Sequence, residues 1–473
     1  MRLEHVGERP IAMTLDGPRP DTAIAGLVDR FCKLRDSGCS PLVLDHGARL
    51  TASSIAAQAA AFAERETVAT LIGSVGPSRD ETFRALFVGD EYSWPDATYI
   101  NACLIHVLDF DDTHFPTVAH IGPGVVGAAL AYTGANDCTS EQFLTAVAVG
   151  ADIAITYANL VGPSHHGRGF HVSATAGQVG SAAVACMLLD LGAPSVAVAF
   201  STAMAGTGGL IAGLGALTNP FWIGTAAMSG VRSALFAARG GTATDLMLEG
   251  RKGVLHAMSS ETVDSDADTA AIEERVASCV TAQPFFLFEE LGLKRIPTGV
   301  AMHAPVELSI EFRNSSSLPL EEIAEVEVVV CDLADAWRIM PPPPQSVTEA
   351  RFDFRHVVAT ALTFSQLTNE ALHASISGDE AAAITDLKER VAIAADSSLT
   401  FSGCRMSIRD AEGTTVWRGE VAAHKGSPES PLDWADLRSK LAYGLALAPD
   451  SDALKRGTIH DILKGSESAE SDS

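Results

Sequence analysis

Apolar residues recur at helical spacing through most of the first 260 positions of the chain. They fall on one face of a helix between residues 20 and 36, with Asp21 placed to cap it. A helix is also predicted at 51–65, followed by short extended pieces at 66–90. The same pattern predicts further helices at 97–110, 124–134, 140–160, 173–190, 194–215 and 224–239. This succession predicts a large, all-helical domain over residues 1–265.

Beyond an acidic, polar stretch at 260–270 the pattern changes, and apolar residues alternate with polar ones. This period of two is typical of strands. Strands are predicted at 306–312, 325–331, 398–410 and 414–421. Helical patterns at 270–290 and 354–374 alternate with them, so residues 266–425 are predicted to form a smaller α+β domain. Another helix is predicted at 431–447, and residues 464–473 are predicted to be a disordered tail.

Three acids and three histidines interrupt the apolar segment 101–131, NACLIHVLDFDDTHFPTVAHIGPGVVGAALA. Asp109, Asp111 and Asp112 come at the C-terminal end of the predicted helix 97–110, where a carboxylate costs a few tenths to about 1 kcal/mol. Acids placed against this local preference indicate a functional site. His120 stands just ahead of the next predicted helix, whose free N–H groups attract a carboxylate.

A similar arrangement recurs at 165–186, HHGRGFHVSATAGQVGSAAVAC. His171 precedes a helix of small residues, and Arg168 supplies a positive charge nearby. Two histidines at two helix starts suit proton transfer on a small acid. A histidine at such a place also often caps or packs, so each position has a purely structural alternative.

Composition narrows the classes of function. With 473 residues, of which 47% are hydrophobic, the chain can bury a large core. Its formal charge of −26 argues against nucleic acid or an anionic membrane as partner. An anionic carboxylate substrate therefore needs a local positive pocket, for which the candidate side chains are Arg168, Arg232, Lys294 and Arg295.

The cysteines and the longest uncharged stretch indicate a reduced, cytoplasmic protein. The eight cysteines form no CxxC pair, so neither an iron–sulfur cluster nor a structural zinc site is predicted. The start of the chain lacks the apolar core of a signal peptide. Residues 191–231 carry no charge, but prolines and glycines interrupt them, which favours a buried helix pair over a membrane span.

Several segments resemble the MmgE/PrpD family of 2-methylcitrate dehydratase and cis-aconitate decarboxylase. They are NACLIHVLDFDDTHFPTVAH, RGFHVSATAGQVGSAAVACMLLDLG, LEGRKG at 248–253 and, more loosely, LKRIPTGVAMH at 293–303. The resemblance implies a helical domain with an α+β lid, and a C-terminal segment, 426–473, that returns to the helical domain. It also implies a homodimer without metal or cofactor.

The resemblance implies that Asp109, Thr113, His120, His171 and Lys294 lie at active-site positions. We expect His120 to transfer the proton and Asp109 to orient it. Thr113 would bind a substrate oxygen, one helical turn beyond Asp109 if the helix continues.

Other histidines have weaker claims. His303 matches the closing histidine of the family's loop, although it is equally well explained as a packed lid residue. His106, three residues before Asp109 on the predicted helix, would support that carboxylate by a hydrogen bond. His114 is a further, weaker candidate.

The sequence also departs from the family. A Lys-x-x-His stretch is replaced here by Asn219-Pro220-Phe221-Trp222, so a cation and a histidine give way to neutral and aromatic groups. Asp353 stands where a serine is usual. The pocket should therefore favour a substrate with fewer negative charges, or a larger apolar part, than a tricarboxylate.

The leading hypothesis is a cofactor-free lyase that dehydrates a small hydroxy acid by abstracting a proton α to a carboxylate. Decarboxylation of a cis-aconitate-like acid and epimerisation start from the same kind of pocket and stay open. A second hypothesis is a metal enzyme that uses Asp109, Asp111, Asp112 and His114. A non-catalytic binding protein derived from the enzyme fold is a third.

Overall fold

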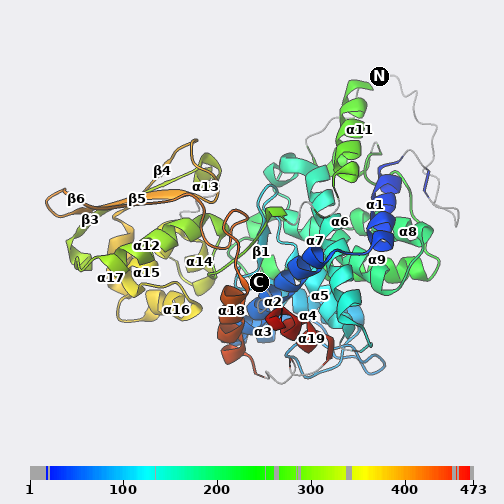
Figure 1. The fold of residues 1–473 in the computed structure, drawn as a ribbon, viewed down its shortest axis with the longest axis horizontal. Helices are drawn as coiled ribbons and strands as arrows, with labels where there is room; N and C mark the ends of the chain where they lie inside the picture. Colours follow the sequence, from blue (N-terminus) through cyan, green and yellow to red (C-terminus); the bar gives the residue numbers. More distant parts are fainter. Residues whose placement is uncertain are drawn as a thin grey trace. The chain divides into compact units, whose positions relative to one another are not determined.

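The computed structural model describes residues 18–19, 22–133, 135–250, 252–259, 266–283, 285, 289–336, 344–449, 454 and 457–468. The chain divides into two compact units (Figure 1). The helical unit comprises Met1–Val107, Asp111–Leu291 and Leu441–Ser473, and the α+β unit comprises Leu108–Phe110 and Gly292–Lys440. This division confirms the predicted fold class, a large helical part with a smaller α+β part.

Helices form nearly all of the regular structure described in the helical unit. Its elements are α1 (Ala23–Ser37), α2 (Pro41–Ala60), η1 (Ala61–Ala63), α3 (Arg65–Ile72), α4 (Trp94–His106), β1 (Asp112–His114), α5 (Gly122–Thr133), α6 (Ser140–Gly167), α7 (Val172–Leu188), α8 (Ala193–Ala205), η2 (Ile211–Gly213), α9 (Thr218–Ala238), α10 (Val254–Met258), α11 (Asp266–Thr281) and α19 (Gly457–Ser468). Strand β2 (Leu291–Leu293) lies at the limit between the two units.

Helices α4, α5, α7 and α9 pack closely through small residues. A methyl group on Gly124 of α5 would lie 2.7 Å from the carbonyl oxygen of Gly177 on α7. One on Gly224 of α9 would lie 2.7 Å from the carbonyl oxygen of Tyr99 on α4. Real Cβ atoms do not approach backbone this closely, so larger residues would push these helices apart. These close contacts thereby set how near the helices lie to one another.

The structure corrects several predicted elements of this unit. Residues 65–72 form α3 instead of extended pieces, and 194–215 divide into α8 and η2. Helix α4 ends at His106, four residues before the predicted end, so the three acids follow the helix instead of completing its last turn. Thr22 caps α1 by accepting the N–H of Ala25, while Asp21 lies outside the described residues.

The α+β unit combines one four-stranded sheet with short helices. Its elements are η4 (Val300–Met302), α12 (His303–Ser315), η5 (Leu320–Glu322), β3 (Ile323–Val330), α13 (Asp332–Ala336), α14 (Val347–Phe352), α15 (Phe354–Phe364), α16 (Asn369–Ser377), α17 (Ala381–Lys388), β4 (Val391–Ala395), β5 (Cys404–Asp410) and β6 (Thr415–Val421). Helix α18 (Trp434–Leu447) begins in this unit and ends in the helical one.

The sheet has the strand order β4-β3-β5-β6, with β3 and β4 parallel and the other pairs antiparallel. Along β3, Val326, Val328 and Val330 are buried, as a period of two requires. Helices α12 and α15 cover this face (Figure 1). The sequence predicted β3 and β6 within two residues of their observed bounds, but it placed the start of β5 six residues early, at 398, and did not predict β4.

The predicted strand at 306–312 is wrong, because these residues lie within helix α12. Val306, Leu308 and Phe312 alternate with polar residues, which suggested a strand. In the structure the buried positions Pro305, Leu308 and Phe312 follow helical spacing instead. Pro305 falls in the first turn of α12, where no intrahelical N–H bond is lost.

The domain limits also differ from those predicted. Helix α11 packs on α1 and α6, so the helical unit extends to Leu291 and not to 265. The chain leaves the α+β unit after Lys440 instead of after 425. Helix α19 runs to Ser468, into the predicted tail, and residues 469–473 lie outside the described part.

One described helix, α6, is long and apolar enough to cross a membrane by length and composition alone. Its apolar window is 89% buried inside the structure. The uncharged stretch 191–231 holds α8 and the first part of α9, with η2 between them. The uncharged stretch is therefore divided between separate helices, as its glycines and prolines predicted.

Candidate active site

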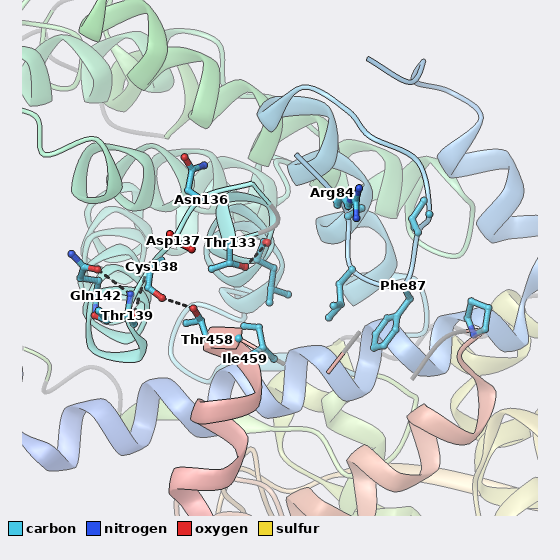
Figure 2. A pocket seen from close by; sticks show the side chains of 17 residues that line it. Arg84, Phe87, Thr133, Asn136, Asp137, Cys138, Thr139, Gln142, Thr458 and Ile459 are labelled. Carbon is cyan, nitrogen blue, oxygen red and sulfur yellow. Dashed lines mark hydrogen bonds between the residues drawn. The ribbon is translucent and has the colours of Figure 1, made fainter. Parts of the chain in front are cut away.

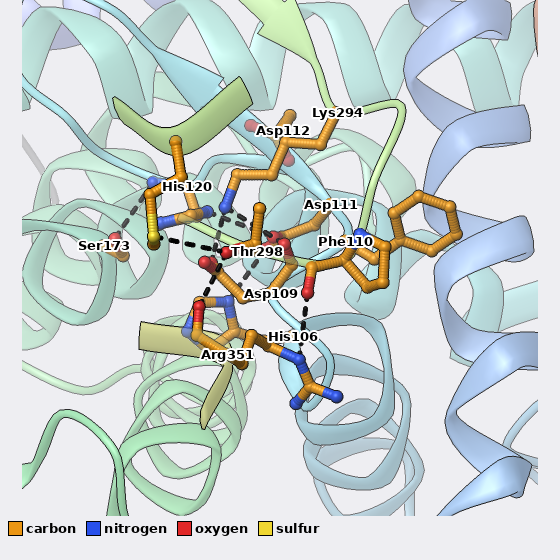
Figure 3. A network of polar contacts seen from close by, with 12 residues as sticks. His106, Asp109, Phe110, Asp111, Asp112, His120, Ser173, Lys294, Thr298 and Arg351 are labelled. Carbon is orange, nitrogen blue, oxygen red and sulfur yellow. Dashed lines mark hydrogen bonds and ion pairs between the residues drawn. The ribbon is translucent and has the colours of Figure 1, made fainter. Parts of the chain in front are cut away.

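Asp111 lies between two histidines in the helical unit and accepts a hydrogen bond from each (Figure 3). Its Oδ2 is 2.8 Å from Nδ1 of His106, and its Oδ1 is 3.1 Å from Nδ1 of His120. Burial by itself would raise the pKa of Asp111, but His120 and His106 hold this pKa well below its usual value. Asp111 is therefore a carboxylate at neutral pH and accepts the Nδ1 proton of both rings.

This proton placement leaves Nε2 as the unprotonated atom of each neutral ring. Nε2 of His106 accepts a hydrogen bond from Nδ2 of Asn219, at 3.1 Å. His106 is thus held on both sides and serves to position Asp111. Because Nδ1 of His120 bonds Asp111, a proton exchanged by this side chain would pass through Nε2. Its side chain is 13% exposed, against 2% for that of His106.

The starts of α5 and α7 place two histidines of this cluster. The backbone N–H of His120, two residues before α5, donates to Oγ of Ser173 on α7 at 2.9 Å. His171 is the N-cap residue of α7, as its position before that helix predicted. The ring centroid of His106 lies 4.7 Å from that of His120 and 6.2 Å from that of His171. The three imidazoles therefore form one buried group.

His171 is neutral and has an unused ring nitrogen. Burial, together with His106 and His120, lowers its pKa well below the usual value. Its Nδ1 is buried and has no hydrogen-bond partner among the described residues. Oδ1 of Asn219 is also buried without a partner there. Buried polar atoms are rarely left unpaired, so these two atoms indicate a place for a ligand.

Asp112 has a structural role at the start of α5. Its Oδ2 and Oδ1 accept the backbone N–H groups of Ile121 and Gly122, at 2.7 and 2.8 Å. Two of the N–H groups at this helix start, where the sequence suggested a substrate carboxylate, are therefore occupied by the side chain of Asp112. Burial and the adjacent Asp111 raise the pKa of Asp112 to about 6.

Asp112→Asn is expected to destabilise the fold by about 1 kcal/mol at low pH, because an amide offers one acceptor oxygen to two N–H donors. A carboxyl with a raised folded-state pKa stabilises the fold most below its ordinary value of 3.8, and this contribution is lost as the pH rises to about 6. The difference in unfolding free energy between wild type and variant should therefore shrink between these pH values. Urea unfolding measured across that range tests this, and a constant difference would contradict it.

The structural surroundings of Thr113 and Arg168 differ from those predicted. Thr113 lies on β1 instead of a continued helix, and its buried Oγ1 has no partner among the described residues. This orphaned hydroxyl keeps Thr113 a candidate for binding a substrate oxygen. Arg168 is exposed at the C-cap of α6, outside the buried histidine group. No contact in the described part of the chain supports the predicted role of Arg168 in binding substrate, which stays a prediction.

The α+β unit holds the other predicted site residues. Nζ of Lys294 is 2.5 Å from Oδ1 of Asp109 and 3.2 Å from its carbonyl oxygen (Figure 3). Asp109 has a positive φ of 50°, which a non-glycine residue adopts only where its surroundings hold it. His303 is buried at the start of α12, and its Nε2 has no partner among the described residues. The active-site roles of these three residues stay predictions.

One predicted contact is replaced, and another contact is new. His106 bonds Asp111 and not Asp109, because α4 ends at His106 and the helical spacing on which that expectation rested is lost. The bond between Asp111 and Nδ1 of His120 was not predicted. The orienting role expected of Asp109 stays a prediction. The sequence contained Asp111 among three acids but gave no signal to choose it.

Asp112 and His114, two members of the metal set considered from the sequence, are engaged in other bonds. Asp112 binds backbone N–H groups, and His114 bonds Thr117 through Nδ1 at 2.7 Å and Glu290 through Nε2 at 3.0 Å. His106, Asp111 and His120 instead offer ligand atoms within 4.8 Å of one another. Two imidazoles and a carboxylate suit a transition metal. In the structure hydrogen bonds already join these atoms.

A separate cavity of about 970 Å³ lies at the other end of α5 (Figure 2). Residues 84–89, Thr133, Cys138 and Thr458 contribute to its lining. His120 precedes the first turn of α5, and Thr133 is in its last turn, so the helix separates cavity and histidines. None of the three histidines lines the cavity.

In the helical unit two histidines share a buried carboxylate, an arrangement that suits proton transfer. The MmgE/PrpD N-terminal domain matches residues 27–265, and the MmgE/PrpD C-terminal domain matches residues 296–462. The chain belongs to the MmgE/PrpD family, as its motifs predicted.

Two curated relatives are cis-aconitate decarboxylases. That of Mus musculus is 24% identical over 380 residues, which cover 78% of this chain and 74% of the relative. That of Homo sapiens is 24% identical over 383 residues, which cover 78% of this chain and 75% of the relative. Family and relatives together indicate an enzyme of the lyase type.

Proposed function

We propose that this enzyme is a lyase that moves a proton at the carbon next to a carboxylate of a small acid. In its simplest form it dehydrates a hydroxy acid. The observation that carries the proposal is the pairing of Asp111 with Nδ1 of His120 at 3.1 Å. An ionised carboxylate on one ring nitrogen makes the other nitrogen a base and stabilises the imidazolium that forms.

In the dehydration, Nε2 of His120 takes the α-proton, and the electrons of the C–H bond form an enolate-like carboxylate. These electrons then form the carbon–carbon double bond while the bond from the β-carbon to the hydroxyl oxygen breaks. The leaving hydroxide takes a proton from the imidazolium of His120 and departs as water. Donors near the substrate oxygens stabilise the developing charge, which is usually the largest contribution. The hydroxyl of Thr113 is one such donor.

Decarboxylation is the second candidate, favoured by the names of the two relatives. Here the carbon–carboxylate bond breaks first, carbon dioxide leaves, and the remaining carbanion takes a proton from the imidazolium of His120. The same side chain therefore serves both reactions. They differ in the protonation state that His120 needs at the start, neutral for dehydration and protonated for decarboxylation.

A mass-resolved turnover screen of the purified protein distinguishes these candidates. The acids tested are small hydroxy- and unsaturated mono-, di- and tricarboxylic acids. Loss or gain of one water supports the dehydratase, and loss of carbon dioxide supports the decarboxylase. Inversion at the α-carbon without a mass change would show an epimerase. Absence of turnover with every acid, by a folded protein, would count against the proposal as a whole.

Treatment with EDTA is expected to leave the rate within about twofold of the untreated enzyme. The reason is that His106 and His120 each use Nδ1 in a hydrogen bond to Asp111, so both carboxylate oxygens and one nitrogen of each ring are already engaged. The measurement is the initial rate before and after dialysis against EDTA, with added Mn²⁺ or Zn²⁺ as the control. Loss of activity that either ion restores would show a metal enzyme instead.

The homodimer and the cytoplasmic location stay predictions of the sequence and the family resemblance. Light scattering of the purified chain measures the first directly.

A further inference from the structure

The surface beside His171 is apolar and carries an exposed tryptophan. The backbone N–H of His171 donates to the carbonyl oxygen of Gly209 at 3.0 Å. A methyl group on Gly209 would lie 3.7 Å from Cβ of His171 and 3.6 Å from Cβ of Trp222. Both side chains thus leave the backbone next to the same glycine. Trp222, in the first turns of α9, is therefore a neighbour of the histidine group.

Three exposed residues of segment 191–231 around this point are large and apolar. Trp222 is 44% exposed, Leu210 57% and Phe221 36%. Leu210 follows Gly209 and forms a backbone bridge with Phe170. No residue between 191 and 231 carries a charge. Large apolar side chains gathered at the surface mark a place where an apolar group binds.

The polar groups offered by Asn219 and His171 are neutral. Nδ2 of Asn219 donates to His106, and the Asn219 amide also acts on His171, whose pKa it raises against the larger lowering by burial. Oδ1 of Asn219 and Nδ1 of His171 make no hydrogen bond of normal geometry among the described residues. Both residues are 7% exposed. A hydroxyl group satisfies such atoms, whereas a further carboxylate would meet no positive charge within residues 191–231. The exposed cation Arg168 lies one residue before Gly169, whose carbonyl oxygen accepts the N–H of Ile211.

We propose that the substrate is a small hydroxy or unsaturated acid with an alkyl or aryl substituent, and not a tricarboxylate. The substituent packs on Trp222 and Leu210, while a neutral polar group of the substrate bonds Oδ1 of Asn219. This inference rests on the proposed lyase function and names the class of substrate for that site. Trp222 then determines specificity without taking part in the proton transfer.

The experiment compares four acids that share one hydroxydicarboxylate skeleton and differ in a single substituent, which is methyl, propyl, phenyl or carboxymethyl. The rates are measured for wild type, Trp222→Ala and Phe236→Ala. Phe236 is 47% exposed near the other end of α9, about 21 Å along the helix, and serves as the matched control. Circular dichroism checks that each variant is folded.

Wild type should prefer the propyl and phenyl acids to the carboxymethyl acid. Trp222→Ala should lower kcat/KM for the phenyl acid about 10- to 100-fold, mainly through KM, and leave the methyl acid nearly unchanged. Phe236→Ala should change neither value. Preference for the carboxymethyl acid, or unchanged selectivity in Trp222→Ala, would overturn the inference and leave the lyase function standing.

Two further outcomes are informative. If Trp222→Ala loses self-association in light scattering while its selectivity is unchanged, the apolar surface is a contact between copies of the chain and the inference is wrong. If wild type turns over none of the four acids and none in the wider screen, the lyase function itself fails. The two failures are thus distinguishable.

Discussion

Replacing His120 with glutamine is expected to lower kcat about 10²- to 10⁴-fold, which is the usual contribution of a positioned general acid or base. Glutamine can keep a hydrogen bond to Asp111 and nearly the same volume, but it cannot exchange a proton at neutral pH. The backbone N–H of residue 120 still donates to Ser173. The fold should therefore be preserved. Steady-state rates at saturating substrate, together with circular dichroism, measure both properties.

His256→Gln provides the matched control, because His256 is exposed on α10 and takes no part in the cluster. It should keep wild-type turnover. Were His120→Gln to retain the rate of this control, His120 would not be the proton-transferring residue, and His171 would be examined next.

Asp111→Asn is expected to reduce kcat by a similar factor, about 10²- to 10⁴-fold, for a different reason. Asp111 accepts Nδ1–H from both His106 and His120. An asparagine accepts one of these bonds and donates the other, so one ring must move its proton from Nδ1 to Nε2. When that ring is His120, the basic nitrogen no longer faces the substrate. The shape of the pH profile of kcat should therefore change, in addition to the lower maximal kcat.

The neighbouring substitution separates this effect from general damage. Asp112→Asn also converts a buried carboxylate to an amide, one residue away, but its bonds go to the backbone at the start of α5. It should affect stability more than turnover, whereas Asp111→Asn should affect turnover more. Equal losses of turnover in both variants would argue that Asp111 only supports the fold.

Much of the site's framework followed from local sequence. Helix α5 begins two residues after His120, and α7 directly after His171, as glycine, proline and small residues at these points predicted. Such starts depend on residues that are adjacent in the chain, and their chemistry can be read without tertiary structure.

The choice of Asp111 could not be predicted in the same way. It depends on where α4 ends, and ends are the least certain feature of a predicted helix. A helix continued to residue 110 would place Asp109 one turn from His106. The helix ends at His106, and Asp109 has a positive φ, so the carboxylate that bonds His106 is that of Asp111 instead.

Contacts between distant segments were equally out of reach. Asn219 bonds His106 across 113 positions, and nothing in either local sequence announces the pairing. The sequence showed that position 219 is unusual for the family but not what its amide does. The misread α12 has another cause, since its apolar residues fit two periods and only packing decides between them.

The main-chain contact between Gly124 and Gly177 bears on how new substrate ranges could be reached by laboratory evolution. It ties α5 to α7 through backbone atoms, so the separation of His120 and His171 does not depend on the side chains that line the substrate site. Trp222 belongs to a third helix, α9. A combinatorial library that varies residues 221 and 222 and keeps both glycines would therefore change substrate specificity while His120 and His171 keep their positions.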